Sequence, residues 1–289
     1  MIWQTNVPLS GYTSYRVGGR AEFLALPKTI GELESVLERG MGLPLTYLGA
    51  GSNLLVSDQG IDGLVIGTKN LRGVTFDETT GRVTVAAGEP LPKLAWRAAQ
   101  RGWSGLEWAV GIPGTVGGMA VMNAGAQGGC SADCVLEVEV FCPIGGLKRL
   151  RVEELGYSYR SSLLQGSNQI VTQVILQLLP GQDKNLIREK TRQNYHQRHS
   201  TQPYHLPSCG SVFRNPLERS AGWLIDRCGL KGFRIGQAQV SELHANFILN
   251  LGGAKAAEIY KLIETIKFQV LEKWSIILEP EVKMIGDFS

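Results

Sequence analysis

The stretch GWSGLEWAVGIPGTVGGMAVMNAGAQGG, residues Gly102–Gly129, is the part of the chain from which we predict its fold. It holds nine glycines in 28 residues, where average usage of about 7% would give about two. Glycine loses the most freedom on folding, so it is kept where the backbone turns sharply or approaches another group closely. Because GIPGTVGG and MNAGA expose mostly main-chain groups, they favour a large polyanionic ligand such as a dinucleotide. The alternative is a long glycine-rich surface loop.

A second candidate ligand loop is GAGSNLLV, residues Gly49–Val56, which follows a short strand predicted over Leu45–Leu48. Backbone N–H groups and two short polar side chains would outline a phosphate cradle there. It is not the dinucleotide fingerprint of a doubly wound sheet, because Leu54 stands at the third glycine position and LLV favours a strand. An ordinary β-turn is the alternative.

Composition indicates a globular chain of two or three domains: 289 residues, 43% hydrophobic and 19% charged. The formal net charge of +3 does not indicate a nucleic-acid partner, but it tolerates an anionic substrate. No apolar run approaches about 18 residues, and the start of the chain lacks a signal-peptide pattern. We therefore expect a cytoplasmic protein with no membrane partner.

Cysteines and histidines do not form a recognisable metal pattern. The five cysteines are irregularly spaced, which predicts free thiols rather than a zinc site or a disulfide framework. His196, His199 and His205 have no carboxylate or cysteine partner at a suitable spacing, so we expect the solvated end of a helix and no metal site.

The periodicity of apolar residues and the positions of turn-forming residues divide the chain into three α/β segments, 1–70, 71–180 and 181–289. The predicted helices cover 29–40, 90–99, 183–199, 220–229 and 254–274. The predicted strands cover 13–23 (two strands around a Gly-Gly turn), 45–48, 83–87, 135–141, 146–152, 171–178, part of 239–250 and 276–285.

Three further stretches carry polar chemistry. In YSYRSS (Tyr157–Ser162), Arg160 has the geometry to bind a carboxylate or phosphate, although an exposed arginine in a polar turn is the alternative. SCGSVF, residues 208–213, presents Ser208, Cys209 and Ser211 on a tight turn. Alternation in the terminal strand puts Glu279 and Glu281 on its less apolar face, while Pro280 indicates an edge strand or a break. A solvent-facing charged strand is the alternative for the two glutamates.

Taken together and in order, these motifs resemble the UDP-N-acetylenolpyruvoylglucosamine reductase family, flavoenzymes of bacterial peptidoglycan precursor synthesis. The resemblance covers nearly the whole chain, and the short connection between YSYRSS and CGSVFRNP is similar to the compact second type of that family. The motifs that carry it are YTSYRVGG, LGAGSNLLVSDQGIDG, GIPGTVGGMAVMNAGA, YSYRSS, CGSVFRNP, AGWLIDRCGLKG, HANFILN and LEPEVKMIG.

The resemblance implies a mixed α/β and α+β fold: a two-lobed FAD-binding fold of the vanillyl-alcohol-oxidase type (1–70 and 71–180) and a C-terminal α+β substrate-binding domain (181–289). It implies FAD as cofactor, NADPH as reductant and UDP-N-acetylglucosamine enolpyruvate as substrate, in a monomer. FAD should be non-covalent, because all four histidines lie beyond residue 190. The cofactor-binding residues it implies are Gly49, Ala50, Gly51, Ser52, Asn53, Leu54, Gly111, Ile112, Pro113, Gly114, Thr115, Gly117, Gly118, Asn123, Ala124 and Gly125.

The resemblance also implies roles for three catalytic residues. Arg160 would hold the substrate carboxylate and stabilise enolate charge, Ser211 would donate a proton to carbon, and Glu281 would polarise the developing enol. We rank Cys209 second to Ser211, because hydride transfer needs no covalent intermediate. The implied substrate-binding residues are Tyr159, Arg214, Asn215 and His244.

Two other functions stay open at this point. One is a different flavin oxidase or dehydrogenase of the same fold that acts on an alcohol or hydroxy acid. The other is a nucleotide-sugar binding protein without turnover.

Overall fold

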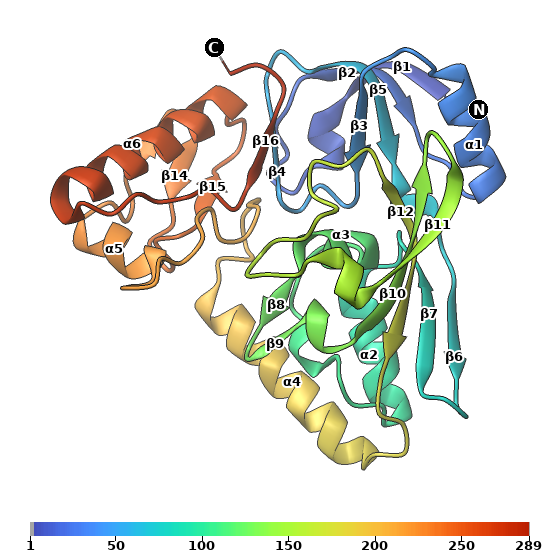
Figure 1. Cartoon of the computed structure of the whole chain (residues 1–289). Helices are drawn as coiled ribbons and strands as arrows, with labels where there is room; N and C mark the ends of the chain where they lie inside the picture. Colours follow the sequence, from blue (N-terminus) through green and yellow to red (C-terminus); the bar gives the residue numbers. More distant parts are fainter. Residues whose placement is uncertain (1–2, 289) are drawn as a thin grey trace. The chain divides into compact units, whose positions relative to one another are not determined.

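Residues 3–288 are described by a computed structural model of the chain (Figure 1). They divide into two units that do not follow chain order. The first unit contains Leu24–Ala50, Leu64–Arg198 and the described start of the chain up to Gln4. The second contains Thr5–Phe23, Gly51–Gly63 and the chain from His199 onward. The predicted cofactor loop at 49–54 therefore contributes residues to both units.

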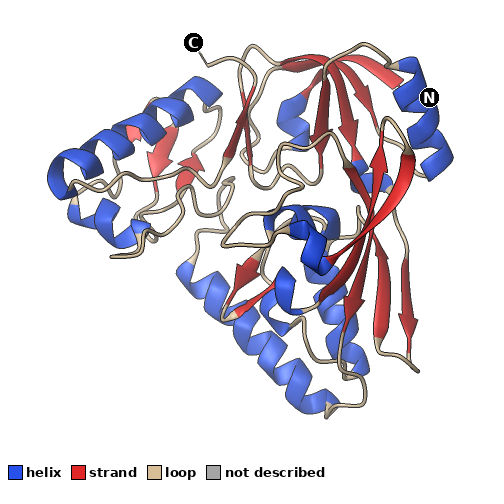
Figure 2. Cartoon of the chain, in the orientation of Figure 1, coloured by secondary structure: helices blue, strands red, loops and turns tan. Residues whose placement is uncertain are grey.

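A five-stranded sheet in the order β11-β10-β12-β7-β6 forms the centre of the first unit (Figure 2). Its central strands are rich in fully buried valines, such as Val138 of β10 opposite Val174 of β12. Helices α2 and α3 add side chains such as Leu94 and Val116 to the same apolar core. The elements are β6 (Val74–Asp77), β7 (Arg82–Ala86), α2 (Leu91–Arg101), α3 (Val116–Met122), β10 (Val135–Cys142), β11 (Gly146–Arg151) and β12 (Ile170–Gln177).

The ends of two helices form as the sequence predicts. Helix α1 (Ile30–Arg39) begins after Thr29, whose Oγ1 accepts a hydrogen bond from Glu32 N at 3.2 Å. Helix α2 begins after Pro90 and ends at Gly102, which has a left-handed φ of 72°. These local signals fix the start of α1 and both ends of α2.

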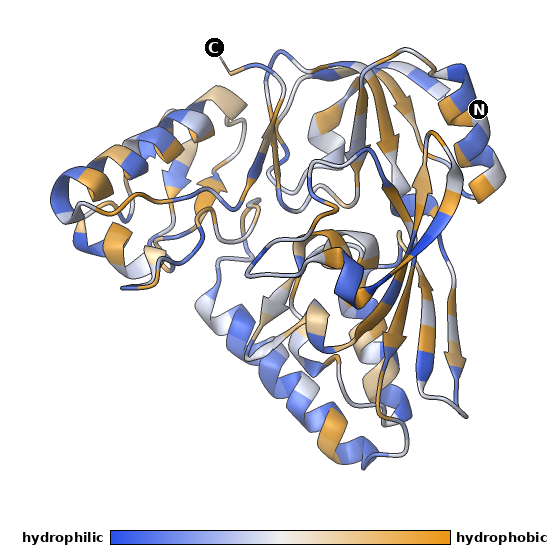
Figure 3. Cartoon of the chain, in the orientation of Figure 1, coloured by the Kyte–Doolittle hydropathy of each residue, from blue (hydrophilic) through white to orange (hydrophobic). Residues whose placement is uncertain are grey.

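A separate four-stranded sheet and several smaller elements precede the C-terminal part of the chain. The order of this sheet is β1-β2-β5-β3, and β3 runs parallel to β5. The helix α4 consists mostly of hydrophilic residues (Figure 3), as the polar stretch predicts. The bounds are β1 (Trp3–Pro8), β2 (Arg20–Ala25), β3 (Leu45–Leu48), β5 (Ile61–Gly67), β8 (Gly125–Ala126), β9 (Gly129–Cys130) and α4 (Lys184–Thr201).

The second unit is built around helix α6 (Ala256–Trp274), which packs on a three-stranded sheet in the order β13-β14-β15. The apolar face predicted for this helix is buried, from Ile259 to Val270. Helix α5 (Ala221–Arg227) packs beside it. The strands are β13 (Arg234–Ile235), β14 (Ala238–Val240) and β15 (Ile248–Asn250).

Two contacts join the N-terminal part of the second unit to its C-terminal part. Strand β16 (Lys283–Ile285) pairs in parallel with β4 (Leu54–Val56), with Lys283 opposite Leu54. Asp58, which follows β4, accepts hydrogen bonds from Ala256 N and Ala257 N, both at 2.9 Å. The carboxylate therefore caps the first turn of α6, whose own N-cap residue, Lys255, makes no side-chain cap bond.

Two predictions of local structure were wrong, and one alternative is excluded. The first strand of 13–23 is absent, because Arg16 has a left-handed φ of 56° and only Arg20–Ala25 is extended in the sheet. The terminal strand is confined to Lys283–Ile285, and Met284 is exposed rather than buried. The alternative of one long glycine-rich surface loop is excluded, since the stretch Gly102–Gly129 contains α3.

Within residues 3–288, no helix is both long enough and apolar enough to cross a membrane.

Candidate functional site

Arg160 lies at the tip of a tight hairpin in the first unit. Ser158 and Ser161 exchange two main-chain hydrogen bonds of 3.1 Å each, so Tyr159 and Arg160 form the turn. Arg160 has a left-handed φ of 55°, which is uncommon for a residue with a side chain and persists only where the surroundings hold it. The guanidinium lies 5.1 Å from the centre of the Tyr159 ring.

Side-chain hydrogen bonds tie this hairpin to α3 and the residues after it. Ser162 Oγ donates to Val121 O at 2.6 Å, and Asn123 Nδ2 donates to Ser158 O at 2.9 Å. Arg160 Nη2 donates to Gly125 O at 2.5 Å. The glycine-rich stretch therefore positions Arg160 directly, a role that the sequence did not suggest for Asn123 and Gly125.

Glycines of the stretch also allow close packing. Gly117 N donates to Ala87 O at 2.8 Å, and a Cβ added at Gly117 would lie 2.8 Å from Ala87 Cβ. Gly118 N donates to Thr115 Oγ1 at 3.3 Å, as expected at the start of a helix. Because both amide hydrogens are already bonded within the protein, we expect Gly117 and Gly118 to support the shape of a ligand site rather than to donate to the ligand.

The two predicted cofactor loops adjoin in the first unit. A Cβ added at Gly49 would lie 3.0 Å from Thr115 Oγ1, so the two loops are in close contact at this glycine. In the second unit, a Cβ added at Gly51 would lie 2.0 Å from Tyr12 O. Residues 49–54 and 111–125 contain no carboxylate, and their short polar side chains are those of Ser52, Asn53, Thr115 and Asn123. This donor set fits a dinucleotide with an anionic diphosphate.

Ser211 and Glu281 are brought together in the second unit by main-chain pairing. Val212, which follows Ser211, accepts hydrogen bonds at its carbonyl from Glu281 N at 2.7 Å and Val282 N at 3.3 Å. Phe213 and Pro280 form an antiparallel bridge in the same pairing. Ser211 and Glu281 are both half-buried. The chain thus carries a hydroxyl and a carboxyl on neighbouring extended segments, 70 residues apart in sequence.

The predicted cofactor loop holds the carboxyl-bearing segment from its other side. Asn53 Nδ2 donates to Glu281 O at 3.0 Å, and Lys283 N donates to Asn53 O at 3.0 Å. Strand pairing between β4 and β16 continues from this point. Asn53 therefore links the loop after Gly49 to Glu281 through two hydrogen bonds.

Cys209 has a structural environment. Its thiol is 4% exposed and donates to Leu54 O at 3.1 Å. Burial raises the pKa of Cys209 to about 12, so the thiolate that would act as a nucleophile is scarce near neutral pH. This environment favours Ser211 over Cys209 as the reacting residue of the loop.

We expect thiol labelling of the native protein near pH 8 to separate the five free cysteines into two groups. Cys130, Cys142 and Cys228 are partly exposed, whereas Cys134 and Cys209 are buried, and burial raises the pKa of each buried thiol to about 12. The first three should react well before the last two. Mass spectrometry of peptides after alkylation measures this, with urea-unfolded protein as the control in which all five react. Native labelling of Cys209 as fast as that of Cys228 would contradict the assignment.

The four predicted substrate-binding residues have different surroundings. Tyr159 is 53% exposed at the hairpin tip. Arg214 Nη1 lies 3.8 Å from Glu279 Oε2, and Asn215 Oδ1 accepts from Ala221 N at 3.0 Å beside the start of α5. His244 Nδ1 accepts from Asn246 N at 3.2 Å. Asn215 and His244 thus also stabilise local turns.

Two residues of the second unit were absent from the predicted site. Lys283 follows Glu281 by two positions, and its pKa is lowered by burial and by the charge of Arg214. Asn246 is a buried asparagine that binds the main chain of Phe213. Each residue had a signal in the sequence. Lys283 shares the odd positions of the terminal strand with Glu281, and Asn246 is a polar residue within the apolar run HANFILN.

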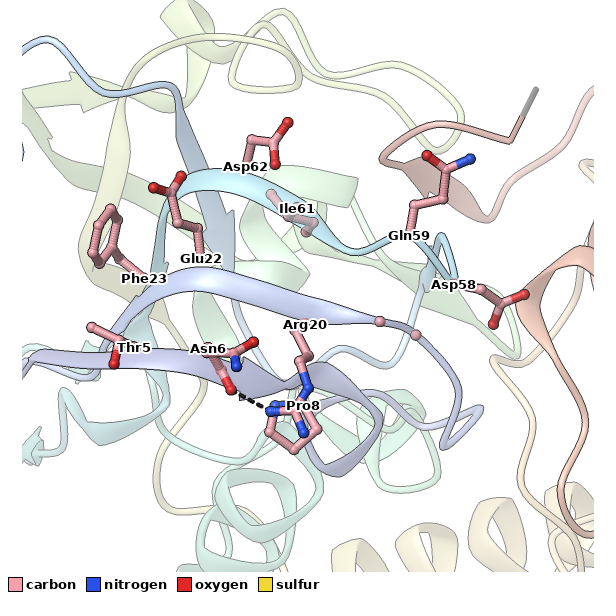
Figure 4. A pocket seen from close by; sticks show the side chains of 12 residues that line it. Thr5, Asn6, Pro8, Arg20, Glu22, Phe23, Asp58, Gln59, Ile61 and Asp62 are labelled. Carbon is pink, nitrogen blue, oxygen red and sulfur yellow. Dashed lines mark hydrogen bonds between the residues drawn. The ribbon is translucent and has the colours of Figure 1, made fainter.

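A shallow open groove of the second unit lies elsewhere (Figure 4). Its lining comes from β1, β2, β5 and the turn before β5, with Glu22 and Asp62 pointing to the same side. Arg20 donates from its guanidinium to Asn6 O at 2.5 Å on the rim. None of the predicted site residues lines this groove.

Comparisons with known proteins cover almost the whole chain. The family model for an FAD binding domain matches residues 21–151, and the model for the C-terminal domain of UDP-N-acetylenolpyruvoylglucosamine reductase matches residues 202–285. The reductase of that name from Trichormus variabilis is 59% identical over 97% of this chain and 85% of its own length. The one from Synechococcus elongatus is 54% identical over 99% of this chain and 95% of its own length.

A solved structure agrees with both family models. The crystal structure of UDP-N-acetylenolpyruvylglucosamine reductase from Thermus caldophilus is 40% identical to this chain. It covers 97% of this chain and 98% of its own chain, with a TM-score of 0.82. The predicted fold, an FAD-binding part followed by a C-terminal α+β domain, is confirmed.

Proposed function

Because the chain belongs to the UDP-N-acetylenolpyruvoylglucosamine reductase family, we propose that it uses NADPH to reduce the enolpyruvyl ether of UDP-N-acetylglucosamine to UDP-N-acetylmuramate. The chain is an FAD-containing oxidoreductase of peptidoglycan synthesis. When bound, FAD would supply the chemistry of hydride transfer between NADPH and the terminal carbon of the enolpyruvyl group. The remaining tasks fall to the side chains of the protein.

FAD would be held by residues 49–54 and 111–125. The support is the contact of Gly49 with Thr115, the close approach at Gly51 and the absence of carboxylates from both loops. A non-covalent site agrees with the positions of the four histidines, all beyond residue 190.

Arg160 would bind the substrate carboxylate and stabilise the negative charge that develops when hydride reaches the neighbouring alkene carbon. A guanidinium presents its N–H donors in a planar fork that matches a carboxylate. The hairpin fixes Arg160 through the bond to Gly125 O and through Gln165 Nε2, which donates to Arg160 O at 2.9 Å. Such preorganised charge stabilises a transition state without further reorganisation.

Ser211 would donate the proton that completes the reduction at the carbon next to the carboxylate, and Glu281 would polarise the enol. The single observation that carries this assignment is the 2.7 Å hydrogen bond from Glu281 N to Val212 O, which places the two segments side by side. A serine is a weak acid, so it needs a neighbouring group that stabilises the alkoxide or replaces the proton. Glu281 lies on the adjacent segment, and we propose that its carboxyl group meets this requirement.

Two cations support an anionic substrate in the second unit. Burial and the charge of Arg214 lower the pKa of Lys283, and Arg214 N donates to Glu279 O at 2.9 Å on the segment that leads to Lys283. A pair of cations that repel each other is stabilised when a dianionic group binds between or beside them. We propose that Arg214 and Lys283 contact the diphosphate of the nucleotide sugar, with Tyr159, Asn215 and His244 as the other substrate contacts.

An anaerobic absorbance experiment tests the proposed function. The purified protein should carry flavin, NADPH should bleach its absorbance faster than NADH does, and UDP-N-acetylglucosamine enolpyruvate should restore the absorbance in the absence of oxygen. Mass spectrometry should then find a product two hydrogens heavier than the substrate. Bleached protein that this substrate does not reoxidise would refute the proposal, and a colourless protein that cannot take up FAD would do so as well.

A further inference from the structure

Asn246 is a buried amide that binds the residues directly after Ser211. Its side chain is nearly inaccessible, with 3% of the residue exposed. Phe213 N donates to Asn246 Oδ1 at 2.9 Å, and Asn246 Nδ2 donates to Phe213 O at 2.8 Å. Val212 N donates to the main-chain carbonyl of Asn246 at 2.9 Å. Three hydrogen bonds from one residue thus fix the main chain of Val212 and Phe213.

Solvent cannot replace these bonds. Val212 and Phe213 are each 1% exposed, so any of their main-chain groups that loses its partner stays buried without one. Only a side chain with both a donor and an acceptor at this length satisfies the N–H and the C=O of Phe213 together. A neutral amide meets that requirement, whereas an ionised carboxylate has acceptors alone.

The same bonds extend to Glu281. The carbonyl of Val212 accepts a hydrogen bond from Glu281 N. The carbonyl of Glu281 in turn accepts one from Asn53 Nδ2. The order of contacts is therefore Asn246, Val212, Glu281 and Asn53, all within the second unit. Val212 lies next to Ser211 in sequence and is bonded to Glu281, so its position bears on both side chains.

We propose that Asn246 is a positioning residue for proton transfer: it holds Val212 and Phe213 and thereby fixes Ser211 and Glu281 relative to each other. This inference rests on the proposed function and adds to it a residue that touches neither substrate nor cofactor. A displacement of about 1 Å in a reacting group costs on the order of 10²-fold in rate. Asn246 should accordingly influence the step that uses Ser211 and leave the step between NADPH and FAD unaffected.

The test is Asn246→Asp, which keeps the shape of the side chain. Stopped-flow absorbance without oxygen gives two rates, bleaching by NADPH and recovery with UDP-N-acetylglucosamine enolpyruvate. At neutral pH the recovery rate should fall roughly 10²-fold, while the bleaching rate stays at the wild-type value. As pH falls, the introduced carboxyl gains a proton and becomes both donor and acceptor, as the amide is. The ratio of recovery to bleaching should then return toward that of the wild type at the same pH.

Asn250→Asp is the matched control. Asn250 lies at the end of β15, four residues after Asn246, and is 4% exposed. It also binds main chain, with Nδ2 donating to Tyr15 O at 2.9 Å and Oδ1 accepting from Gly252 N and Ala254 N. This variant should lose thermal stability to a similar extent. Its ratio of recovery to bleaching should match the wild type across the pH range, because its bonds do not involve Val212 or Glu281.

Hydrogen exchange supplies a readout that needs no turnover. The peptide containing Glu281 should exchange its amide hydrogens faster in Asn246→Asp than in Asn250→Asp, because Val212 O is the acceptor for Glu281 N. If Asn246→Asp does not fold at neutral pH, Asn246→Ser replaces it. Its shorter side chain leaves groups of Phe213 without their partners, so the ratio of recovery to bleaching should fall in this variant as well.

The outcomes separate the positioning role from the proposed function. A flavin-loaded Asn246 variant with the wild-type ratio and wild-type exchange at Glu281 overturns the inference. An equal change in the ratio for Asn250→Asp also overturns it, because the effect would then be one of general stability. If the wild type itself is not reoxidised by the substrate, the proposed function fails, and the exchange comparison still decides whether Asn246 holds Glu281.

Discussion

Replacing Ser211 with alanine is expected to leave bleaching of the flavin absorbance by NADPH unchanged and to slow its recovery with the enolpyruvyl substrate by about 10²–10⁴-fold. The reason is that the hydroxyl is the proposed proton donor, and alanine has no proton to give. Gly210, with a left-handed φ of 76°, turns the chain just before Ser211, and Val212 after it is anchored to Glu281. Loss of the hydroxyl should therefore not disturb the loop.

The measurement is anaerobic stopped-flow absorbance for the two rates, with mass spectrometry for the product. Ser208→Ala is the control, because Ser208 lies in the same loop and is half-buried as well. It should change neither rate. Recovery in Ser211→Ala at the wild-type rate would exclude Ser211 as the acid and would direct attention to Glu281.

The change Arg160→Lys should slow the same recovery step by about 10²–10³-fold and raise the KM for the enolpyruvyl substrate. Lysine keeps the charge, so the loss measures the contribution of the guanidinium fork to holding the carboxylate and the enolate charge. Lysine also has no group that reproduces the paired geometry of the guanidinium, which donates to Gly125 O and lies beside the Tyr159 ring.

Steady-state kinetics with varied substrate, together with the two stopped-flow rates, check this result. Arg149→Lys is a suitable control, since Arg149 is 63% exposed in its side chain on β11 and lies 3.5 Å from Glu139 in a surface ion pair. Surface pairs of this kind contribute little, so its kinetics should equal those of the wild type. If Arg160→Lys behaves as Arg149→Lys does, Arg160 is not the carboxylate ligand.

Local elements of the fold were predictable from the sequence because their causes lie within a few residues. Thr29 with Glu32 starts α1, Gly102 ends α2, and the spacing from Ile259 to Val270 gives the buried face of α6. The stretch at 13–23 was mispredicted because a left-handed φ at Arg16 is set by its surroundings and not by residue type.

The candidate site was predictable only as separate motifs. Ser211 and Glu281 stand out by residue type, but the hydrogen bond that joins their segments depends on a pairing across 70 residues. Asn246 was missed because a buried asparagine in an apolar run has no local signature of the main chain it binds. The bonds from Asn123 and Gly125 to the Arg160 hairpin were missed for the same reason. The catalytic roles and the boundaries at 70 and 180 stay predictions.

The parallel pairing of β4 with β16 has a consequence for the order in which the protein is made. Leu54 and Lys283 face each other although they are 229 positions apart, so this sheet cannot close until Lys283 has been synthesised and has left the ribosome. Until then β4 lacks its partner strand, and Asp58 has no helix to cap until α6, which begins at Ala256, has formed. A nascent chain halted before Lys283 should therefore depend on chaperones. The C-terminal segment produced alone would lack strand β4, which pairs with β16, and Asp58, which caps α6.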